Sequence, residues 1–348
     1  MPDPNFDRFR AAMHRREADR VPLGEMHADK EVKEAFLGRA VKTLDDEVEF
    51  WYRAGYDYVC LPMGVMYAEV VGRDLKQTDI PTAYAEGHRA NWAEEGFGPL
   101  ATDAGLANFP WPEPDKIDLE LYRRVPLKKG MQVIAYFGKI YTYTWMQMGM
   151  TGFAVALYEN PRLVARVFRE FGERHLAIFE RILELPDIGG VWIADDLAYT
   201  EGMLVNPAVL REHCFPWYRR MGQMCRERGI LFIFHSDGDI RPVIPDLIDC
   251  GFHAIHPIEP KAMDIRELKR DYGDRLALIG NLDLKYTLPR GTPAEVRAEV
   301  RGLIRDVAPG GGYACGSSNS VTYYVPLANF NAMREAVFEF GRYPIRAS

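Results

Sequence analysis

The chain has 348 residues, a formal net charge of −7 at pH 7 and a sequence pI near 5.7. Hydrophobic residues make up 47% and charged residues 27%, values that are ordinary for a globular protein and exclude a disordered chain. Because basic residues are not in excess, we expect no nucleic-acid partner and no attachment to an acidic membrane surface.

The sequence also predicts the compartment. No apolar run approaches the roughly 20 residues that a membrane-spanning helix needs, and the N-terminus is polar. The five cysteines are scattered and form no Cys-x-x-Cys motif. This usage is typical of reduced thiols, so we expect a cytoplasmic protein without disulfides.

Short apolar runs alternate with amphipathic segments along most of the chain, a pattern typical of parallel α/β proteins. Strands are predicted at residues 21–25, 58–61, 131–135, 190–194, 230–234, 253–255, 276–279 and 311–315. Helices are predicted at residues 45–54, 161–184, 207–228 (with a kink at Pro216), 242–250, 264–272, 292–307 and 326–340.

Eight strands with intervening helices predict an α/β fold, a single (β/α)8 TIM barrel domain over residues 1–348. Residues 64–114 do not follow this alternation of strands and helices, and we interpret them as an insertion or lid after the second strand. An open doubly wound sheet is the alternative. The lack of a Gly-x-Gly-x-x-Gly motif after the first strand disfavours a dinucleotide-binding version of it.

In a barrel, functional side chains follow the carboxyl ends of the strands. Acids, imidazoles, amides, hydroxyls and one thiol occupy these places, without lysine or arginine: Glu25, His27, Asp195, Asp196, His235, Asp237, Asp239, His256, Glu259, Asn281, Asp283, Cys315, Ser317 and Asn319. This set indicates a metal site, or a reaction that is cationic or needs a proton acceptor.

His235 and Asp237 lie two residues apart, so an extended chain points both side chains to one side. Cys315 could face the same axis and complete a set of zinc ligands, although a small buried cysteine fits the position equally well. Of the neighbouring acids Asp195 and Asp196, we expect one to point into the mouth as a catalytic group. Glu259 is either a ligand or a helix cap.

The aromatic stretch after the third strand has two interpretations. Tyr141, Tyr143 and Trp145 either pack in the core or form an apolar wall for a flat ligand. With the strand-end groups they give the predicted substrate-binding set, which is Glu25, His27, Tyr141, Tyr143, Trp145 and Asn281.

The motifs at residues 194–197, 205–218, 235–240, 280–283 and 309–320 resemble the uroporphyrinogen decarboxylase superfamily. The resemblance implies a (β/α)8 barrel and one of two chemistries, cofactor-free decarboxylation or zinc-dependent methyl transfer with a corrinoid protein. True decarboxylases hold substrate carboxylates with an arginine-rich segment after the first strand. Here residues 24–30 carry no arginine and include two acids, which argues against an octa-anionic substrate.

The methyltransferase branch resembles this chain more closely. It binds zinc through a His-x-Cys pair and a later Cys, so the resemblance implies His235 and Cys315 as ligands, with Asp237 in place of the first Cys. A carboxylate is an acceptable zinc ligand, but a harder site suits an oxygen-bearing substrate better than a thiol.

The leading hypothesis is therefore a zinc-dependent methyltransferase that moves a methyl group between a small substrate, such as a methyl ether in O-demethylation, and a corrinoid carrier. His235, Cys315 and either Asp237 or Glu259 would hold zinc, and His235 with Asp195 or Asp196 would form the catalytic set. The chain has no Asp-x-His-x-x-Gly motif, so we expect a separate corrinoid protein. For the oligomeric state of this chain, we consider a homodimer.

Two other functions stay open at this point. One is a cofactor-free decarboxylase on the same barrel, in which Asp195 or Asp196 stabilises a developing cation. The other is a catalytically silent barrel that presents a small ligand to a partner.

Overall fold

The computed structural model describes residues 3–63, 76–79, 89–92 and 96–345. Its central sheet is parallel, with the strand order β1-β4-β5-β8-β9-β10-β11. These strands are β1 (Tyr58–Pro62), β4 (Gln132–Phe137), β5 (Ile188–Ala194), β8 (Leu231–His235), β9 (Ala254–His256), β10 (Ala277–Leu282) and β11 (Tyr313–Ser317). All seven coincide with predicted strands to within a few residues.

The predicted first strand takes the eighth place without becoming a regular strand. Gly24 N donates to Cys315 O at 2.9 Å, and Cys315 N donates to Pro22 O at 3.0 Å. On the other side, the Tyr58 hydroxyl of β1 accepts from Glu25 N at 2.8 Å and donates to Glu25 O at 2.7 Å. The segment thus bridges β11 and β1, and the whole forms the expected (β/α)8 barrel.

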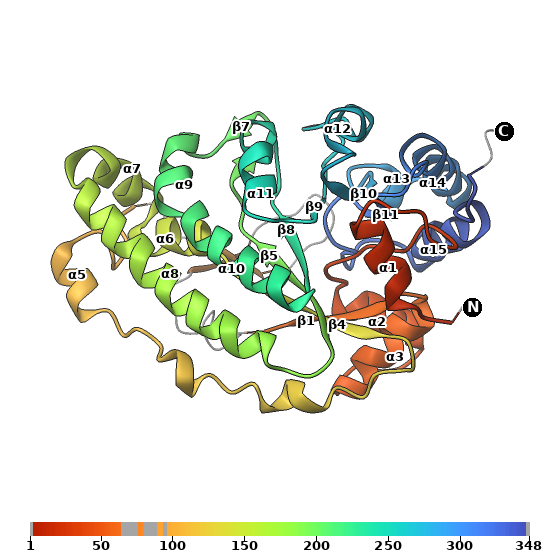
Figure 1. Ribbon diagram of the computed structural model, residues 1–348, viewed down its shortest axis with the longest axis horizontal. Helices are drawn as coiled ribbons and strands as arrows, with labels where there is room; N and C mark the ends of the chain where they lie inside the picture. The colour runs from red at the N-terminus through yellow and green to blue at the C-terminus, as the bar shows by residue number, and fades with distance from the viewer. Residues whose placement is uncertain (1–2, 64–75, 80–88, 93–95, 346–348) are drawn as a thin grey trace.

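Helices surround the strands (Figure 1). They are α1 (Phe6–Met13), α2 (Lys30–Leu37), α3 (Leu44–Ala54), α5 (Asp103–Asn108), α6 (Ile140–Met148), α7 (Met150–Glu159), α8 (Pro161–Leu183), α9 (Pro207–His213), α10 (Phe215–Arg228), α11 (Ile244–Asp249), α12 (Ile265–Tyr272), α13 (Thr287–Arg290), α14 (Pro293–Val307) and α15 (Leu327–Phe340). Short 3₁₀ helices lie at Pro114–Lys116, Glu120–Arg124 and Arg241–Val243.

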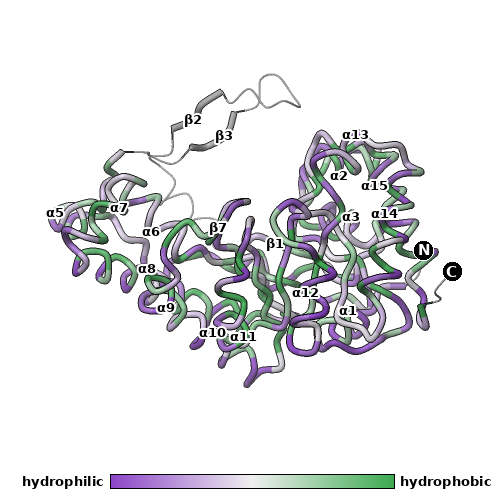
Figure 2. Tube along the Cα trace, turned by 90° about the horizontal axis from the view of Figure 1, so that it is seen from above, coloured by the Kyte–Doolittle hydropathy of each residue, from purple (hydrophilic) through white to green (hydrophobic). Residues whose placement is uncertain are grey.

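Local chemistry explains several helix boundaries. Thr292 and Glu295 form a capping box at the start of α14, as the sequence predicts. The single helix predicted at 207–228 is instead two helices, α9 and α10, which meet at Cys214 just before Pro216. Green and purple alternate along many helices in Figure 2, as expected where one helix face packs on the strands.

Small strand pairs lie outside the main sheet. β2 (Lys76–Asp79) pairs antiparallel with β3 (Arg89–Trp92), within the predicted insertion at 64–114. Residues 64–75, 80–88 and 93–95 of that insertion lie outside the described residues, so its interpretation as a lid stays a prediction. β6 (Ala198–Tyr199) and β7 (Gly202–Met203) form a hairpin just after β5. Within the described ranges, no helix has the length and apolarity to cross a membrane.

The two faces of β8 are buried in different surroundings. Phe232 and Phe234 contact aromatic rings of the helical layer and of Phe252. Because side chains alternate along a strand, His235 points the other way, into the barrel. There the register pairs His235 with His256 and Ala194 with His235, so the carboxyl ends of β5, β8 and β9 lie level with one another.

A buried ion pair lies next to the first residue of β1. Arg8 Nη1 donates to Asp57 Oδ1 at 2.5 Å, and the two side chains are 5% and 1% exposed. Arg8 keeps Asp19 as a second partner, but the buried Arg20, whose Nη2 lies 4.0 Å from Asp57 Oδ1, loses its ion pair. We therefore expect Asp57→Asn to lower the free energy of unfolding by about 3 kcal/mol. Urea unfolding measures it. Asp271→Asn, at an exposed pair with Arg270, is the control and should leave stability near that of the wild type. Equal effects of the two substitutions would contradict the buried pair's importance.

Candidate functional site

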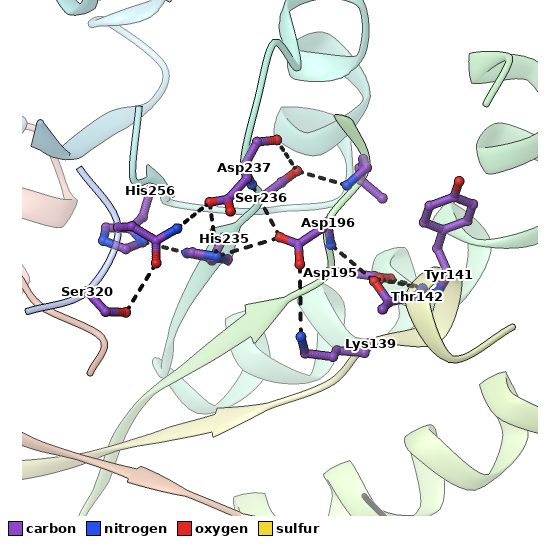
Figure 3. Close-up of polar contacts among 12 residues, drawn as sticks. Lys139, Tyr141, Thr142, Asp195, Asp196, His235, Ser236, Asp237, His256 and Ser320 are labelled. Atoms are coloured by element: carbon purple, nitrogen blue, oxygen red, sulfur yellow. Dashed lines mark hydrogen bonds and ion pairs between the residues drawn. The ribbon is translucent and has the colours of Figure 1, made fainter. Parts of the chain in front are cut away.

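Three ligand-type side chains meet at the carboxyl ends of β5 and β8 (Figure 3). Asp196, His235 and Asp237 each offer one ligand atom, and these atoms lie within 4.8 Å of one another. His235 is the last residue of β8 and is 5% exposed, while both acids follow strand ends and remain partly exposed. Two carboxylates and one imidazole in this arrangement can bind a divalent cation.

The imidazole of His235 is held from behind by a second histidine. His235 Nδ1 and His256 Nδ1 share a hydrogen bond of 2.8 Å, and burial lowers the pKa of both rings below the usual 6.5. Both rings are therefore neutral at pH 7. His235 Nε2 faces the two acids, 3.7 Å from Asp196 Oδ1 and 3.6 Å from Asp237 Oδ1, distances too long for hydrogen bonds.

The surroundings of Asp237 disfavour its charged form. Burial, and then the negative charges of Asp196 and Glu259, raise the pKa of Asp237 to about 7. Asn319 Nδ2 donates to Asp237 Oδ1 at 2.7 Å and partly offsets this effect. A cation bound between the acids would relieve their mutual repulsion.

A lysine also belongs to the site, contrary to the prediction of strand ends without basic residues. Lys139 follows β4, and its Nζ lies 3.9 Å from Asp196 Oδ2. Its backbone has a φ of 137°, just after Gly138 with a φ of 105°. Two consecutive residues with positive φ turn the chain sharply at the end of β4, and this turn directs the Lys139 side chain toward Asp196 at the mouth of the barrel. Sequence reasoning missed Lys139 because it assigned no ligand to this turn.

The neighbouring acids Asp195 and Asp196 have different environments. Asp195 is completely buried and accepts four hydrogen bonds: from Tyr141 N (2.8 Å), Thr142 N (2.7 Å), Thr142 Oγ1 (2.7 Å) and Tyr218 Oη (2.5 Å). These contacts fix the first turn of α6 to the end of β5. Asp195 is thereby occupied as an anchor, and Asp196 is the acid that faces the cluster.

Cys315 does not join the cluster. Tyr313 and Cys315 lie on the same face of β11, and Glu299 of α14 is close enough to both to affect their pKa values. This is the face that α14 covers, and burial there raises the pKa of the Cys315 thiol to about 12. Cys315, which the resemblance implies as a zinc ligand, therefore has its side chain turned away from His235. The residue beyond β11 that reaches the site is Asn319.

Glu259 lies beside the cluster rather than in it. Its Oε2 accepts a hydrogen bond from Gly238 N at 3.0 Å, which ties the loop after β9 to the loop after β8. It also borders a pocket of about 430 Å³ together with Asn319, Asp283 and Tyr324. Glu259 therefore shapes a pocket next to the acids.

The other predicted substrate-binding residues lie in varied positions. Glu25 is fully buried and accepts from Ser317 N at 2.5 Å and Ser317 Oγ at 2.9 Å. His27 is half exposed, and its Nε2 lies 3.2 Å from Asp29 Oδ1. Asn281 Nδ2 donates to Ile258 O at 2.8 Å, so its amide supports the loop after β9.

The aromatic wall is only partly formed. Tyr141 is buried against Phe153 of α7, and Tyr143 packs on Phe171 and His175 of α8. Trp145 is half-buried against the core. Tyr136 of β4 is a further aromatic residue in this region. Burial raises the pKa of Tyr136, Lys139 lowers it and Asp196 raises it. Tyr136 also lines a pocket of about 430 Å³ beside β1.

Comparisons with known proteins agree with this architecture. The family model described as uroporphyrinogen decarboxylase (URO-D) matches residues 121–340. A methylcobamide:CoM methyltransferase from Methanosarcina barkeri is 29% identical over 152 residues, which are 42% of this chain and 41% of that protein. A uroporphyrinogen decarboxylase from Pseudoalteromonas translucida is 33% identical over 78 residues, 22% of each chain. The longer of these matches thus spans about two fifths of the relative's length.

Among solved structures, a methyltransferase from Methanosarcina mazei superposes with a TM-score of 0.70. The alignment covers 96% of this chain and 98% of that one, at 17% identity. The two proteins therefore share a fold from end to end.

The burial of Glu25 has a measurable consequence. Burial raises the pKa of Glu25 from 4.5 to about 8, and the Ser317 hydrogen bonds only partly oppose it. The folded state therefore holds this proton more tightly than the unfolded chain. Its contribution to stability is complete below about pH 4.5 and is lost as pH rises towards 8.

Glu25→Gln copies the neutral acid at every pH and should remove this loss. Relative to the wild type, the variant should gain up to about 1.4 kcal/mol of stability per pH unit across that window. Urea unfolding of both proteins at several pH values measures the difference. Parallel pH profiles of the two proteins would contradict a protonated Glu25.

Proposed function

We propose that this chain, which belongs to the uroporphyrinogen decarboxylase family, is a zinc-dependent methyltransferase that exchanges a methyl group between a small substrate and a corrinoid protein. The observation that carries the proposal is the Asp196, His235 and Asp237 cluster at the barrel mouth. Methyltransferases among the similar proteins support the same chemistry. We propose a cytoplasmic location, since all five cysteines are free and buried.

The donor set fits a divalent metal. His235 presents Nε2 toward two carboxylates at distances too long for a hydrogen bond between the ring and either acid, and its Nδ1 already has a partner. Zinc accepts imidazole and carboxylate ligands, so Asp196, His235 and Asp237 would hold it. When bound, it would act as a Lewis acid on the heteroatom that carries or accepts the methyl group.

The chain's own residues supply the rest of the site. Asp196 offers Oδ1 to the cluster while Oδ2 faces Lys139, so the lysine can orient the carboxylate and hold a negative substrate atom. Tyr136 extends from this group into the pocket beside β1, where an apolar body could lie. Because the donors are oxygen and nitrogen, we favour an oxygen-bearing substrate such as a methyl ether, in an O-demethylation.

A cofactor-free decarboxylase is the second candidate, since one similar protein is a uroporphyrinogen decarboxylase. In this alternative Lys139 would bind a substrate carboxylate, and chelators would not affect the activity. The methyltransferase predicts chelator-sensitive turnover instead. A homodimer remains a prediction for either function.

The direct test uses defined corrinoids. Zinc-loaded protein is incubated anaerobically with a methoxylated aromatic and cob(I)alamin, and separately with methylcobalamin and coenzyme M. Formation or loss of methylcobalamin is followed by absorbance. We expect methyl transfer in at least one reaction, abolished by a chelator. Uroporphyrinogen decarboxylation that survives the chelator would favour the alternative instead.

His235→Ala should abolish zinc binding and methyl transfer and leave the fold intact, because His235 is the last residue of β8 and the apolar core residues of that strand precede it. Metal analysis after dialysis measures the change. His14→Ala is the matched control, since His14 contacts His253 at the opposite end of β9. Wild-type protein with less than about a tenth of an equivalent of zinc would rule out the zinc site.

Asp237→Cys gives this chain the His-x-Cys pair that the resemblance to the methyltransferase branch implies for zinc binding. Thiolate is a softer and stronger zinc donor than carboxylate, so the variant should retain zinc more tightly in competition with a chelator. Unchanged retention would mean that Asp237 is not a ligand.

A further inference from the structure

His256 lies directly behind His235 inside the barrel. It is the last residue of β9, its Cα is the partner of the His235 Cα, and the two ring centroids are 5.0 Å apart. The Nδ1 atoms of the two rings lie 2.8 Å apart, a hydrogen-bonding distance. His235 is 5% and His256 1% exposed, so water does not compete for this contact.

His256 itself cannot reach a substrate. Its Nε2 is buried and has no hydrogen-bond partner among the residues that the structure describes, and its ring meets Trp192 edge to face, with centroids 4.9 Å apart and planes at 84°. Trp192 blocks this side of the ring. Any effect of His256 on the chemistry must therefore pass through His235.

The shared hydrogen bond holds one proton, and its position decides what His235 can do. If the proton is on His256 Nδ1, His235 carries its own proton on Nε2 and cannot offer a lone pair to a metal. If it is on His235 Nδ1, then Nε2 is free and faces Asp196 and Asp237. Metal-binding histidines commonly donate their second ring N–H to a buried acceptor in this way.

We propose that His256 is a positioning residue, which accepts the Nδ1 proton of His235 and thereby directs the Nε2 lone pair of His235 into the acidic cluster. The inference rests on the proposed metal site and adds the residue that orients its central ligand. An imidazole serves here where a carboxylate or backbone carbonyl is usual. It adds no third negative charge to a site that already holds two acids.

The test compares two variants of equal shape. Asn can accept a hydrogen bond near the position of the histidine Nδ1, whereas Leu has the same number and branching of side-chain heavy atoms and no acceptor. Both remove the imidazole ring beside Trp192, so the loss of the ring itself affects the two variants in the same way. Circular dichroism confirms that each variant is folded.

Zinc affinity is measured for the wild type, His256→Asn and His256→Leu by titration against a chelating indicator. We expect His256→Leu to bind zinc about 10–100-fold more weakly than the wild type, and His256→Asn to recover most of that loss. Wild-type affinity in His256→Leu would overturn the positioning role and leave the metal site standing. No zinc binding by the wild type would overturn the proposed metal site and the inference with it.

A second measurement is made on the wild-type protein, and a variant serves only to assign the signal. In zinc-loaded wild-type protein with ¹⁵N-labelled histidine, long-range ¹H–¹⁵N spectra distinguish a protonated Nδ1 from a protonated Nε2. The His235→Ala spectrum assigns the signal. We expect the His235 proton on Nδ1. A His235 ring that binds zinc through Nδ1 would contradict the proposal.

Discussion

The register between β5, β8 and β9 is the constraint on which the candidate site depends. Ala194 pairs with His235 and His235 pairs with His256, so the residues after β5 lie beside those after β8. A slip of one residue would turn His235 out of the barrel and toward α10, whose Tyr218 now contacts Phe234. The cluster therefore needs the barrel's strand pairing as much as it needs its ligands.

The acids at this end of the barrel differ in how far protein contacts compensate their negative charge. Asp195 receives four hydrogen bonds, which oppose the rise in its pKa that burial causes and hold α6 in place. Glu25 has fewer partners, and burial raises its pKa to about 8. Asp196 and Asp237 lie on either side of His235 Nε2, and their charges are opposed by Lys139, by Asn319 and by the hydrogen bond from Asp237 N to Asp196 Oδ1 at 3.3 Å. The remaining negative charge is the physical reason to expect a cation there.

Sequence reasoning predicted the parts that follow from periodicity. Apolar runs located the strands, and the alternation of side chains placed His235 and Asp237 on one side of a strand end. It did not determine the face of β11 on which Cys315 lies, because that depends on the packing of α14. Lys139 was missed because a backbone with positive φ, rather than a strand end, brings it to the mouth. Asn319 was noted but given no role, since the loop after β11 decides where it points.

Zinc-edge anomalous diffraction from crystals of the wild-type protein tests the central claim most directly. The account predicts one anomalous peak bounded by Asp196, His235 and Asp237, with Cys315 outside its coordination sphere. A peak coordinated by Cys315, or zinc-soaked crystals with no peak at this cluster, would contradict it.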